Sequence, residues 1–248
     1  MISIDLSGTV VAVTGAAGGV GSGIARRFAD AGAAVVLQHH RSDAPSLEAL
    51  GGTCTVQTDL THAEGPSRVV AAAVESFGKL DAIVNNAGIQ PVGPFMEIDD
   101  DEWNTMLDTN VTACHRLTRA FAEHVFDRQA AGSVVHIASI EGTHPAIGHS
   151  HYCTSKAALI MHARAAAVEL GPKRVRVNSV SPGLIHRPGI EEAWPDGVER
   201  WATTAPLQRM GQPNDIGDAC VFLCSPLASW ITGVDLVVDG GVSACNTW

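Results

Sequence analysis

Three side chains in the middle of the chain are spaced for proton transfer. Tyr152 stands thirteen positions after Ser139, and Lys156 follows Tyr152 by four positions. Residues four apart lie on one face of a helix. Because an ammonium stabilises a phenolate, the pair predicts that Tyr152 ionises easily and exchanges a proton with a substrate oxygen near neutral pH. Taken alone, the spacing is common by chance, and a surface tyrosine near a solvated lysine is the simpler explanation.

A glycine cluster strengthens the functional interpretation. The segment Thr14-Gly15-Ala16-Ala17-Gly18-Gly19-Val20-Gly21 follows an apolar run and precedes a helical pattern. Glycines at such a place permit unusual backbone angles, and they let a pyrophosphate approach the N–H groups at a helix N-terminus. A tight turn without a ligand is the alternative, but the position between a first strand and a first helix favours dinucleotide binding.

Cofactor choice is indicated by the residues after the second apolar run. The segment Gln38-His39-His40-Arg41-Ser42 contains no carboxylate that would accept hydrogen bonds from the ribose hydroxyls of NAD. Arg41 can instead pair with the 2′-phosphate of NADP, with Ser42 as a further donor. We therefore predict that NADP(H) is preferred and that NAD(H) is possible. A solvated arginine in a loop is the alternative.

Together these motifs resemble those of the short-chain dehydrogenase/reductase family, from about Leu6 to Gly241. The family's TGxxxGxG pattern is present as Thr14, Gly15, Gly19 and Gly21, and its adenine-binding aspartate matches Asp59. Its NNAG motif is Asn85-Asn86-Ala87-Gly88, its active-site asparagine is Asn110, its Ser-Tyr-Lys set is Ser139, Tyr152 and Lys156, and its PG turn is Pro182-Gly183. The run from Gln38 to Ser42 is similar to that of the family's NADP-binding pteridine reductases.

The resemblance implies a role for each matched residue. Tyr152 exchanges the proton with the substrate oxygen, Ser139 hydrogen-bonds that oxygen, and Lys156 binds the nicotinamide ribose and favours the phenolate. Asn110 anchors a water through which Lys156 relays a proton to solvent. The implied cofactor contacts are Gly15, Gly19, Val20, Gly21, His40, Arg41, Ser42, Asp59, Leu60, Asn86, Ala87, Gly88, Tyr152, Lys156, Pro182, Gly183 and Ile185.

One family feature is missing. Members of the family often carry a threonine a few residues beyond the PG turn, bonded to the nicotinamide carboxamide, and Arg187 stands near that place here. We expect the backbone of Ile185 to hold the carboxamide instead.

The elements that must position these residues alternate regularly along the chain. Short apolar runs predict seven strands, several of them apolar nearly throughout, as for strands buried on both faces. The strands are expected at Val10–Thr14, Ala34–Gln38, Thr53–Gln57, Asp81–Val84, Ser133–Ile137, Arg174–Val180 and Val234–Val238, and helices at Gly21–Ala31, Ala63–Phe77, Glu102–Arg128, Ser155–Leu170 and Asp215–Leu223. This order predicts an α/β fold, a single Rossmann-type domain over residues 1–248 with a doubly wound parallel sheet and helices on both faces.

Two irregular segments interrupt this alternation. The stretch from Arg41 to Gly52 is short for a crossover helix, so that edge of the sheet is expected to carry only a turn or two of helix. The segment 183–206 is rich in proline, glycine, tryptophan and charge, and it reads as a long loop with a helical piece. We expect this second segment to form a substrate lid.

The substrate class is inferred from the polar side chains of the presumed pocket segments. The presumed pocket segments carry Glu141, His144, His149, Arg187 and Trp194, with His151, His186, Glu191, Glu192 and Trp201 nearby. If several face inward, they offer donors and acceptors that suit a sugar or polyol, whereas a lipid-like chain would leave them unpaired. Exposure of these side chains to solvent is equally compatible with the sequence. A 3-oxoacyl thioester or general ketone reductase is the alternative, and a non-catalytic dinucleotide-binding sensor is a more distant one.

Composition limits the possible partners. The net charge of -10 argues against nucleic acid and anionic membranes. His149 and His151 would lie on one side of an extended segment, but they lack the further ligands of a metal site, so no metal is predicted. Six cysteines without a CxxC pair, and an N-terminus without a signal pattern, predict free thiols and a cytoplasmic protein. The resemblance implies a homotetramer, with segments 102–128 and 155–170 and the C-terminal Trp248 at its interfaces.

Overall fold

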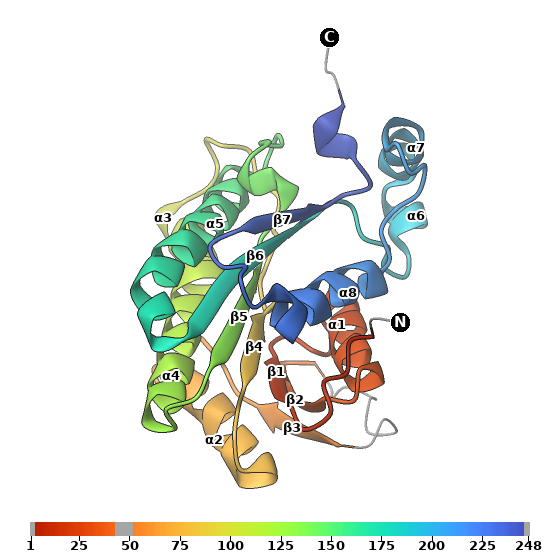
Figure 1. The fold of residues 1–248 in the computed structure, drawn as a ribbon. Helices are drawn as coiled ribbons and strands as arrows, with labels where there is room; N and C mark the ends of the chain where they lie inside the picture. Colours follow the sequence, from red (N-terminus) through yellow and green to blue (C-terminus); the bar gives the residue numbers. More distant parts are fainter. Residues whose placement is uncertain (1–2, 43–51, 246–248) are drawn as a thin grey trace.

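The computed structural model describes residues 3–42 and 52–245, and these form one parallel sheet between two helical layers (Figure 1). The strand order is β3-β2-β1-β4-β5-β6-β7, and every neighbouring pair is parallel. This confirms the doubly wound Rossmann-type sheet. The strands are β1 (Val10–Val13), β2 (Ala34–His39), β3 (Thr53–Gln57), β4 (Ala82–Asn85), β5 (Gly132–Ile137), β6 (Val175–Pro182) and β7 (Asp235–Val238).

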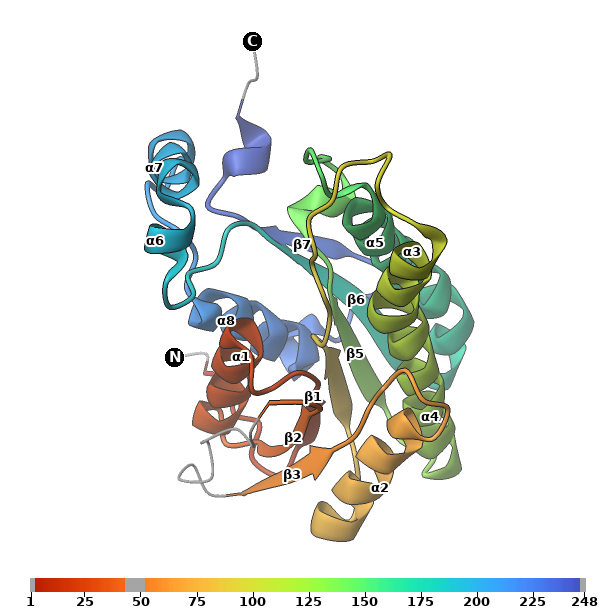
Figure 2. The same cartoon turned by 180° about the vertical axis from the view of Figure 1, so that it is seen from behind.

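Helices cover both faces of the sheet (Figure 2). One face carries α1 (Gly19–Asp30) and α8 (Pro213–Cys224), and the other carries α2 (Gly65–Phe77), α4 (Ala113–Asp127) and α5 (Ser150–Leu170). The remaining helical elements are α3 (Asp100–Leu107), the π-helical turn η2 (Asp108–Thr112), the 3₁₀ turns η3 (Ile140–Gly142), η4 (Gly171–Lys173), η5 (Pro226–Ala228) and η6 (Val242–Ala244), α6 (Ile190–Ala193) and α7 (Pro195–Thr204).

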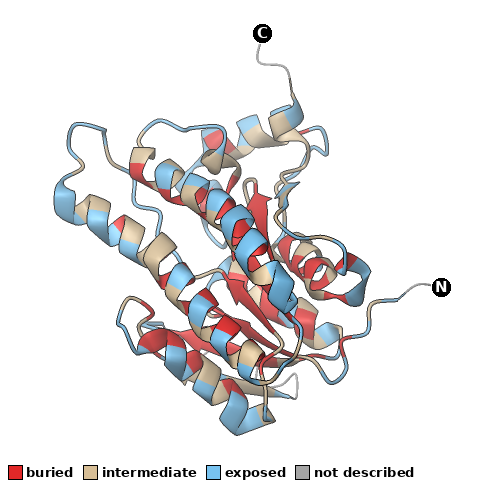
Figure 3. Cartoon of the chain, turned by 60° about the vertical axis from the view of Figure 1, so that its left-hand side comes forward, coloured by how far each residue is buried: buried red, intermediate tan, exposed pale blue. Residues whose placement is uncertain are grey.

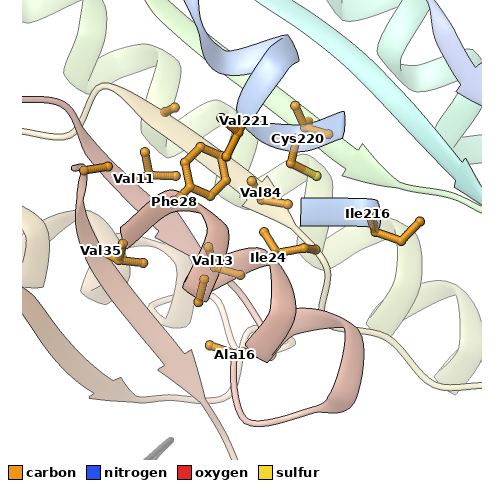
Figure 4. Close-up of a cluster of buried hydrophobic side chains, with 14 of the residues drawn as sticks. Val11, Val13, Ala16, Ile24, Phe28, Val35, Val84, Ile216, Cys220 and Val221 are labelled. Atoms are coloured by element: carbon orange, nitrogen blue, oxygen red, sulfur yellow. The ribbon is translucent and has the colours of Figure 1, made fainter. Parts of the chain in front are cut away.

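Alternation along each strand divides the core into two layers. In β1, Val11 and Val13 face α1 and α8, where Phe28 is fully buried (Figure 4). Val10 and Ala12 face the opposite layer with α2, α4 and α5. Both faces of the central strands are therefore buried, as their continuous apolar runs predict (Figure 3). Removing a ring such as that of Phe28 would cost about 3–5 kcal/mol.

The long helix expected at Glu102–Arg128 is divided. It runs as α3, then a single π-helical turn over Asp108–Thr112, then α4. Single π turns inside α-helices often mark functional sites, and Asn110 lies in the middle of this one. The helix expected from Ser155 starts earlier, at Ser150, and so includes Tyr152. His149 and His151 consequently flank a helix start, and the extended geometry expected for them is wrong.

The irregular segments are partly described. Residues 43–51 lie outside the described residues, so the expectation for the segment from Arg41 to Gly52 stays a prediction. The expected lid contains α6 and α7, two short exposed helices that stand apart from the sheet (Figure 1). Within the described ranges, no helix combines the length and the apolar character needed to cross a membrane.

Candidate active site

Tyr152 and Lys156 lie one turn apart near the start of α5, next to the carboxyl end of β5. The Lys156 Nζ is 5.4 Å from the centre of the Tyr152 ring and donates a 2.8 Å hydrogen bond to the carbonyl oxygen of Ile137, the last residue of β5. Ser139 follows two residues later, and its hydroxyl lies near enough to the Tyr152 phenol to lower the pKa of that group. The structure thus brings together the three residues whose spacing indicated proton transfer.

The expected easy ionisation of Tyr152 is wrong for the chain by itself. The pKa of Tyr152 is raised to about 12, chiefly because the phenol is buried; the charge of Glu141 contributes to this rise, and the Ser139 hydroxyl acts against it. The sequence shows the nearby cation but not the desolvation, and here desolvation is the larger effect. In addition, Lys156 directs its ammonium to the Ile137 carbonyl.

Lys156 is buried as well, with 5% of its surface exposed. Burial lowers its pKa to about 8, because an ammonium loses hydration in the interior. Around neutral pH the Lys156 side chain is therefore mostly cationic, and it loses its proton as the pH rises through about 8.

Asn110 is held in one orientation by the segment that follows β4. Its Nδ2 donates to the Ile89 carbonyl at 3.0 Å, and the Ile89 N–H donates to its Oδ1 at 2.9 Å. Nδ2 also lies 3.0 Å from Ser155 Oγ, which ties Asn110 to α5. A Cβ on Gly88 would lie 3.0 Å from Asn110 Oδ1 and 3.8 Å from Lys156 Nζ, so the glycine leaves room between these two polar groups.

The glycine-rich turn after β1 has the shape of a phosphate cradle. Gly15 has φ of +62°, and a Cβ on Gly21 would collide with the Gly15 carbonyl oxygen, so both positions require glycine. Gly18 and Gly19 are exposed at the start of α1, where backbone N–H groups are available to an anion. Val20, also in this first turn, is half-buried.

Two side chains hold this turn in place. Thr14 Oγ1 accepts hydrogen bonds from the N–H groups of Asn86 and Ala87, each at 2.9 Å. Gln38 Oε1 accepts from the Gly15 N–H at 2.9 Å, while its Nε2 donates to the Thr58 carbonyl. Gln38 therefore has a structural role, because its side chain connects β2, the end of β3 and the glycine turn.

The residues expected around the adenosine lie together at the ends of β2 and β3. His40, Arg41 and Ser42 are exposed after β2, and His40 Nε2 is 3.5 Å from Asp59 Oδ2. Although burial acts to raise it, the hydrogen bonds from Thr61 keep the pKa of Asp59 below its usual value, so the carboxylate stays charged. Leu60, the next residue, is buried. Among the ion pairs of the described residues, Arg41 takes part in none.

Of the expected substrate residues, two lie beside Tyr152. His149 Nδ1 is 2.7 Å from Glu141 Oε2, and the His149 ring packs edge-on against the Tyr152 ring with centroids 5.8 Å apart. His144 is exposed and hydrogen-bonds to Thr143 through Nδ1. His151 is fully buried and turns the other way, with Nε2 3.3 Å from Glu102 Oε1.

Two of the residues in the expected lid lie next to segments that are expected to bind the cofactor. The Arg187 Cβ is 4.0 Å from where a Cβ on Gly19 would stand, and Trp194, the residue between α6 and α7, packs on Gly197 of α7. Trp201 packs on the Pro182-Gly183 turn, since a Cβ on Gly183 would lie 2.6 Å from its Cζ2. Ile185 pairs with Gly211 in a single β-bridge. No contact among those recorded for the described residues joins Arg187 or Trp194 to Tyr152.

Comparison with known proteins agrees with this geometry. A family model described as enoyl-(acyl carrier protein) reductase matches residues 15–243. A 2,5-dichloro-2,5-cyclohexadiene-1,4-diol dehydrogenase from Sphingobium indicum is 36% identical, with 96% of this chain and 97% of that protein covered. An L-rhamnose 1-dehydrogenase (NAD(P)(+)) from Azotobacter vinelandii is 35% identical, with 98% of each covered. A crystal structure of a short-chain type dehydrogenase/reductase from Mycobacterium marinum superposes with a TM-score of 0.91 at 34% identity, covering 98% of both chains.

The chain belongs to the short-chain dehydrogenase/reductase family. It is therefore an NAD(P)-dependent oxidoreductase that acts on CH–OH and C=O groups. The glycine cradle and the polar residues at the carboxyl ends of the strands fit a bound dinucleotide in this short-chain dehydrogenase/reductase.

Sequence reasoning missed two features of this enzyme. Gln38 was noted only as a non-acidic residue, although its side chain supports the glycine turn. The close pairing of Glu141 with His149, and the position of Cys153 Sγ 3.6 Å from the same Glu141 oxygen, were also not anticipated. His149 and Cys153 follow Glu141 by eight and twelve positions, with an irregular segment between them, so no periodic pattern could have revealed these contacts.

Proposed function

We propose that this enzyme interconverts a secondary alcohol and its carbonyl on a small, hydroxyl-rich substrate, a sugar or polyol, with Tyr152 as the acid/base. The observation that carries the proposal is the position of the Tyr152 phenol near the Ser139 hydroxyl, with the Lys156 ammonium 5.4 Å from the Tyr152 ring. The nicotinamide, when bound, supplies or accepts the hydride. The chain's own residues hold the substrate oxygen and move its proton.

Each residue then has a defined task. In oxidation, Tyr152 takes the hydroxyl proton, and in reduction it donates one to the new alkoxide. Ser139 hydrogen-bonds the same substrate oxygen. Lys156 binds the nicotinamide ribose, and Asn110, which is fixed by its hydrogen bonds to Ile89, anchors the water through which Lys156 relays a proton to solvent. The remaining cofactor contacts are those expected from the sequence.

The preferred cofactor in this proposal is NADP(H), with NAD(H) possible. Support comes from Arg41, which is exposed after β2. No carboxylate lies in the segment 38–42 to repel a 2′-phosphate.

The substrate class is supported by the polar pair beside Tyr152. Glu141 Oε1 and His149 Nε2 are not used in their mutual contact, and so they are available to substrate hydroxyls. Two relatives are named for a cyclic diol and for rhamnose, which are hydroxylated substrates. Glu141 and His149 are the substrate contacts that the geometry favours, while His144, Arg187 and Trp194 stay predictions.

An oxoacyl thioester or ketone reductase is the second candidate. It is favoured by a relative from Chlamydia pneumoniae that is named a 3-oxoacyl-[acyl-carrier-protein] reductase and is 32% identical over 98% of this chain. Initial rates over sugars, polyols, ketones and acetoacetyl thioesters, with both cofactors, separate the two candidates. We expect turnover of a sugar or polyol, with KM raised by Glu141→Ala and His144→Ala. Efficient reduction of acetoacetyl thioesters with no activity on any sugar or polyol would contradict the first candidate.

We further propose a homotetramer in the cytoplasm. All six cysteines are free thiols, which suits a reducing compartment. On α5, Met161 is 58% exposed and Val168 is 78% exposed, which supports helix-to-helix contact between two copies. Trp248 lies outside the described residues. A monomeric mass in light scattering at micromolar concentration would contradict this assembly.

A further inference from the structure

The carboxylate of Glu141 stands close to the reactive phenol. Glu141 lies in η3, two residues after Ser139, and its backbone N–H donates a 3.1 Å hydrogen bond to Ser139 Oγ. Its side chain is 20% exposed, so its charge is only partly screened by water. An anion at this place opposes the formation of a phenolate on Tyr152, and it also opposes a thiolate on the neighbouring Cys153.

His149 is placed to offset that charge. Its side chain is 16% exposed and lies between Glu141, at 2.7 Å, and the Tyr152 ring, at 5.8 Å between centroids. A carboxylate can only accept hydrogen bonds, so His149 Nδ1 donates to it. This hydrogen bond draws part of the carboxylate charge onto the His149 ring, so Tyr152 faces a hydrogen-bonded carboxylate rather than a free one.

We propose that the Glu141–His149 pair sets how readily Tyr152 releases its proton, with His149 shielding the phenol from the Glu141 carboxylate. This rests on the proposed role of Tyr152 as acid/base and adds two positioning residues to it. In the direction of oxidation, Tyr152 must accept the substrate proton, so a shielded Glu141 favours catalysis at lower pH.

The other ionisable groups around Tyr152 do not replace this pair. Lys156 is the cation on α5, and its ammonium is engaged with the Ile137 carbonyl. Cys153, also on α5, is a thiol whose pKa is raised by burial, so it stays neutral. Cys114 of α4 interacts with Lys156, and burial raises its pKa to about 11, so this thiol carries no charge around neutral pH.

The chain offers a direct readout, because Tyr152 is its only tyrosine. Absorbance of tyrosinate in the near ultraviolet therefore reports the ionisation of this one phenol, without substrate or cofactor. The Tyr152→Phe variant supplies the blank for the tryptophans. Circular dichroism identifies the pH range in which every variant stays folded, and the comparison is made within that range.

The variants are Glu141→Gln, His149→Phe and the double variant, with His144→Gln as a control for the phenol titration. His149→Phe keeps a ring of similar shape and loses the hydrogen-bond donor, whereas His144 is exposed and bonded to Thr143. We expect Glu141→Gln to shift Tyr152 ionisation down by roughly one pH unit, which is about tenfold more tyrosinate relative to phenol at a fixed pH. We expect His149→Phe to shift it up, the double variant to match Glu141→Gln, and His144→Gln to leave the phenol titration as in the wild type.

Unchanged phenol titration in both Glu141→Gln and His149→Phe, or a shift of both in the same direction, would overturn the proposal. The pH dependence of alcohol oxidation should move with the absorbance in each variant. If Tyr152→Phe retained full turnover, the role of Tyr152 in catalysis would fail. The absorbance shifts would then still decide whether the pair controls the phenol.

Discussion

The Thr14 hydroxyl oxygen accepts a 2.9 Å hydrogen bond from the backbone N–H of Asn86, joining the end of β1 to the end of β4. The same oxygen accepts from the Ala87 N–H, and the hydroxyl donates to the Val84 carbonyl. One buried side chain therefore satisfies three backbone groups and fixes the distance between the glycine turn and the NNAG segment.

Replacing Thr14 by valine should destabilise the protein by about 2 kcal/mol or more, because a similar shape leaves two buried N–H groups unpaired. Denaturant unfolding measures this directly. Thr154→Val is the control, since Thr154 is exposed and bonds only to the Ser150 carbonyl of its own helix. Equal stability of the Thr14 and Thr154 variants would contradict the bridging role of Thr14.

Arg41→Ala should weaken NADPH binding by about tenfold or more and change NADH binding little, because only NADPH carries a 2′-phosphate. Fluorescence titration of each cofactor provides the dissociation constants. Arg68→Ala, on the exposed surface of α2, tests whether loss of any positive charge has the same effect. A wild type that prefers NADH, or equal weakening of both cofactors, would rule out the assignment of Arg41.

The stability of the protein should depend on pH through Lys156. Its pKa is about 8 in the folded chain, below the usual lysine value of 10.5, so between these values the unfolded chain binds more protons and stability rises with pH. Relative to Lys156→Met, the wild type should gain about 2 kcal/mol of unfolding free energy from about pH 7 to about pH 9.5. If the difference between the two proteins stayed constant over this range, Lys156 would not titrate as its burial implies.

The fold was predictable because its signals are local. Apolar runs such as Val10–Val13 and Ala82–Asn85 are buried on both faces, and their alternation with helical patterns leaves few topologies. The π turn at Asp108–Thr112 was not predictable, because it interrupts a helical pattern that continues on both sides. The start of α5 at Ser150 was likewise missed, since Ser150 and His151 have no strong helix preference.

The sequence indicates which residues form the candidate site, but not how readily they ionise. Ser139, Tyr152 and Lys156 were identified by type and spacing, and the sheet brings them together. The ionisation of Tyr152 was wrongly expected because burial and the charge of Glu141 depend on tertiary structure. Arg187 was expected at the substrate, yet its Cβ lies near Gly19, because the chain after β6 returns toward α1.

Turnover by Tyr152→Phe tests the assigned chemistry most directly. The variant keeps the ring and loses only the hydroxyl that exchanges the proton, and no other tyrosine is present to substitute for it. We predict that it folds, still binds NADPH, and loses at least about 100-fold in kcat, the usual contribution of a positioned acid/base. Turnover near the wild-type rate, with cofactor binding intact, would contradict Tyr152 as the acid/base of this enzyme.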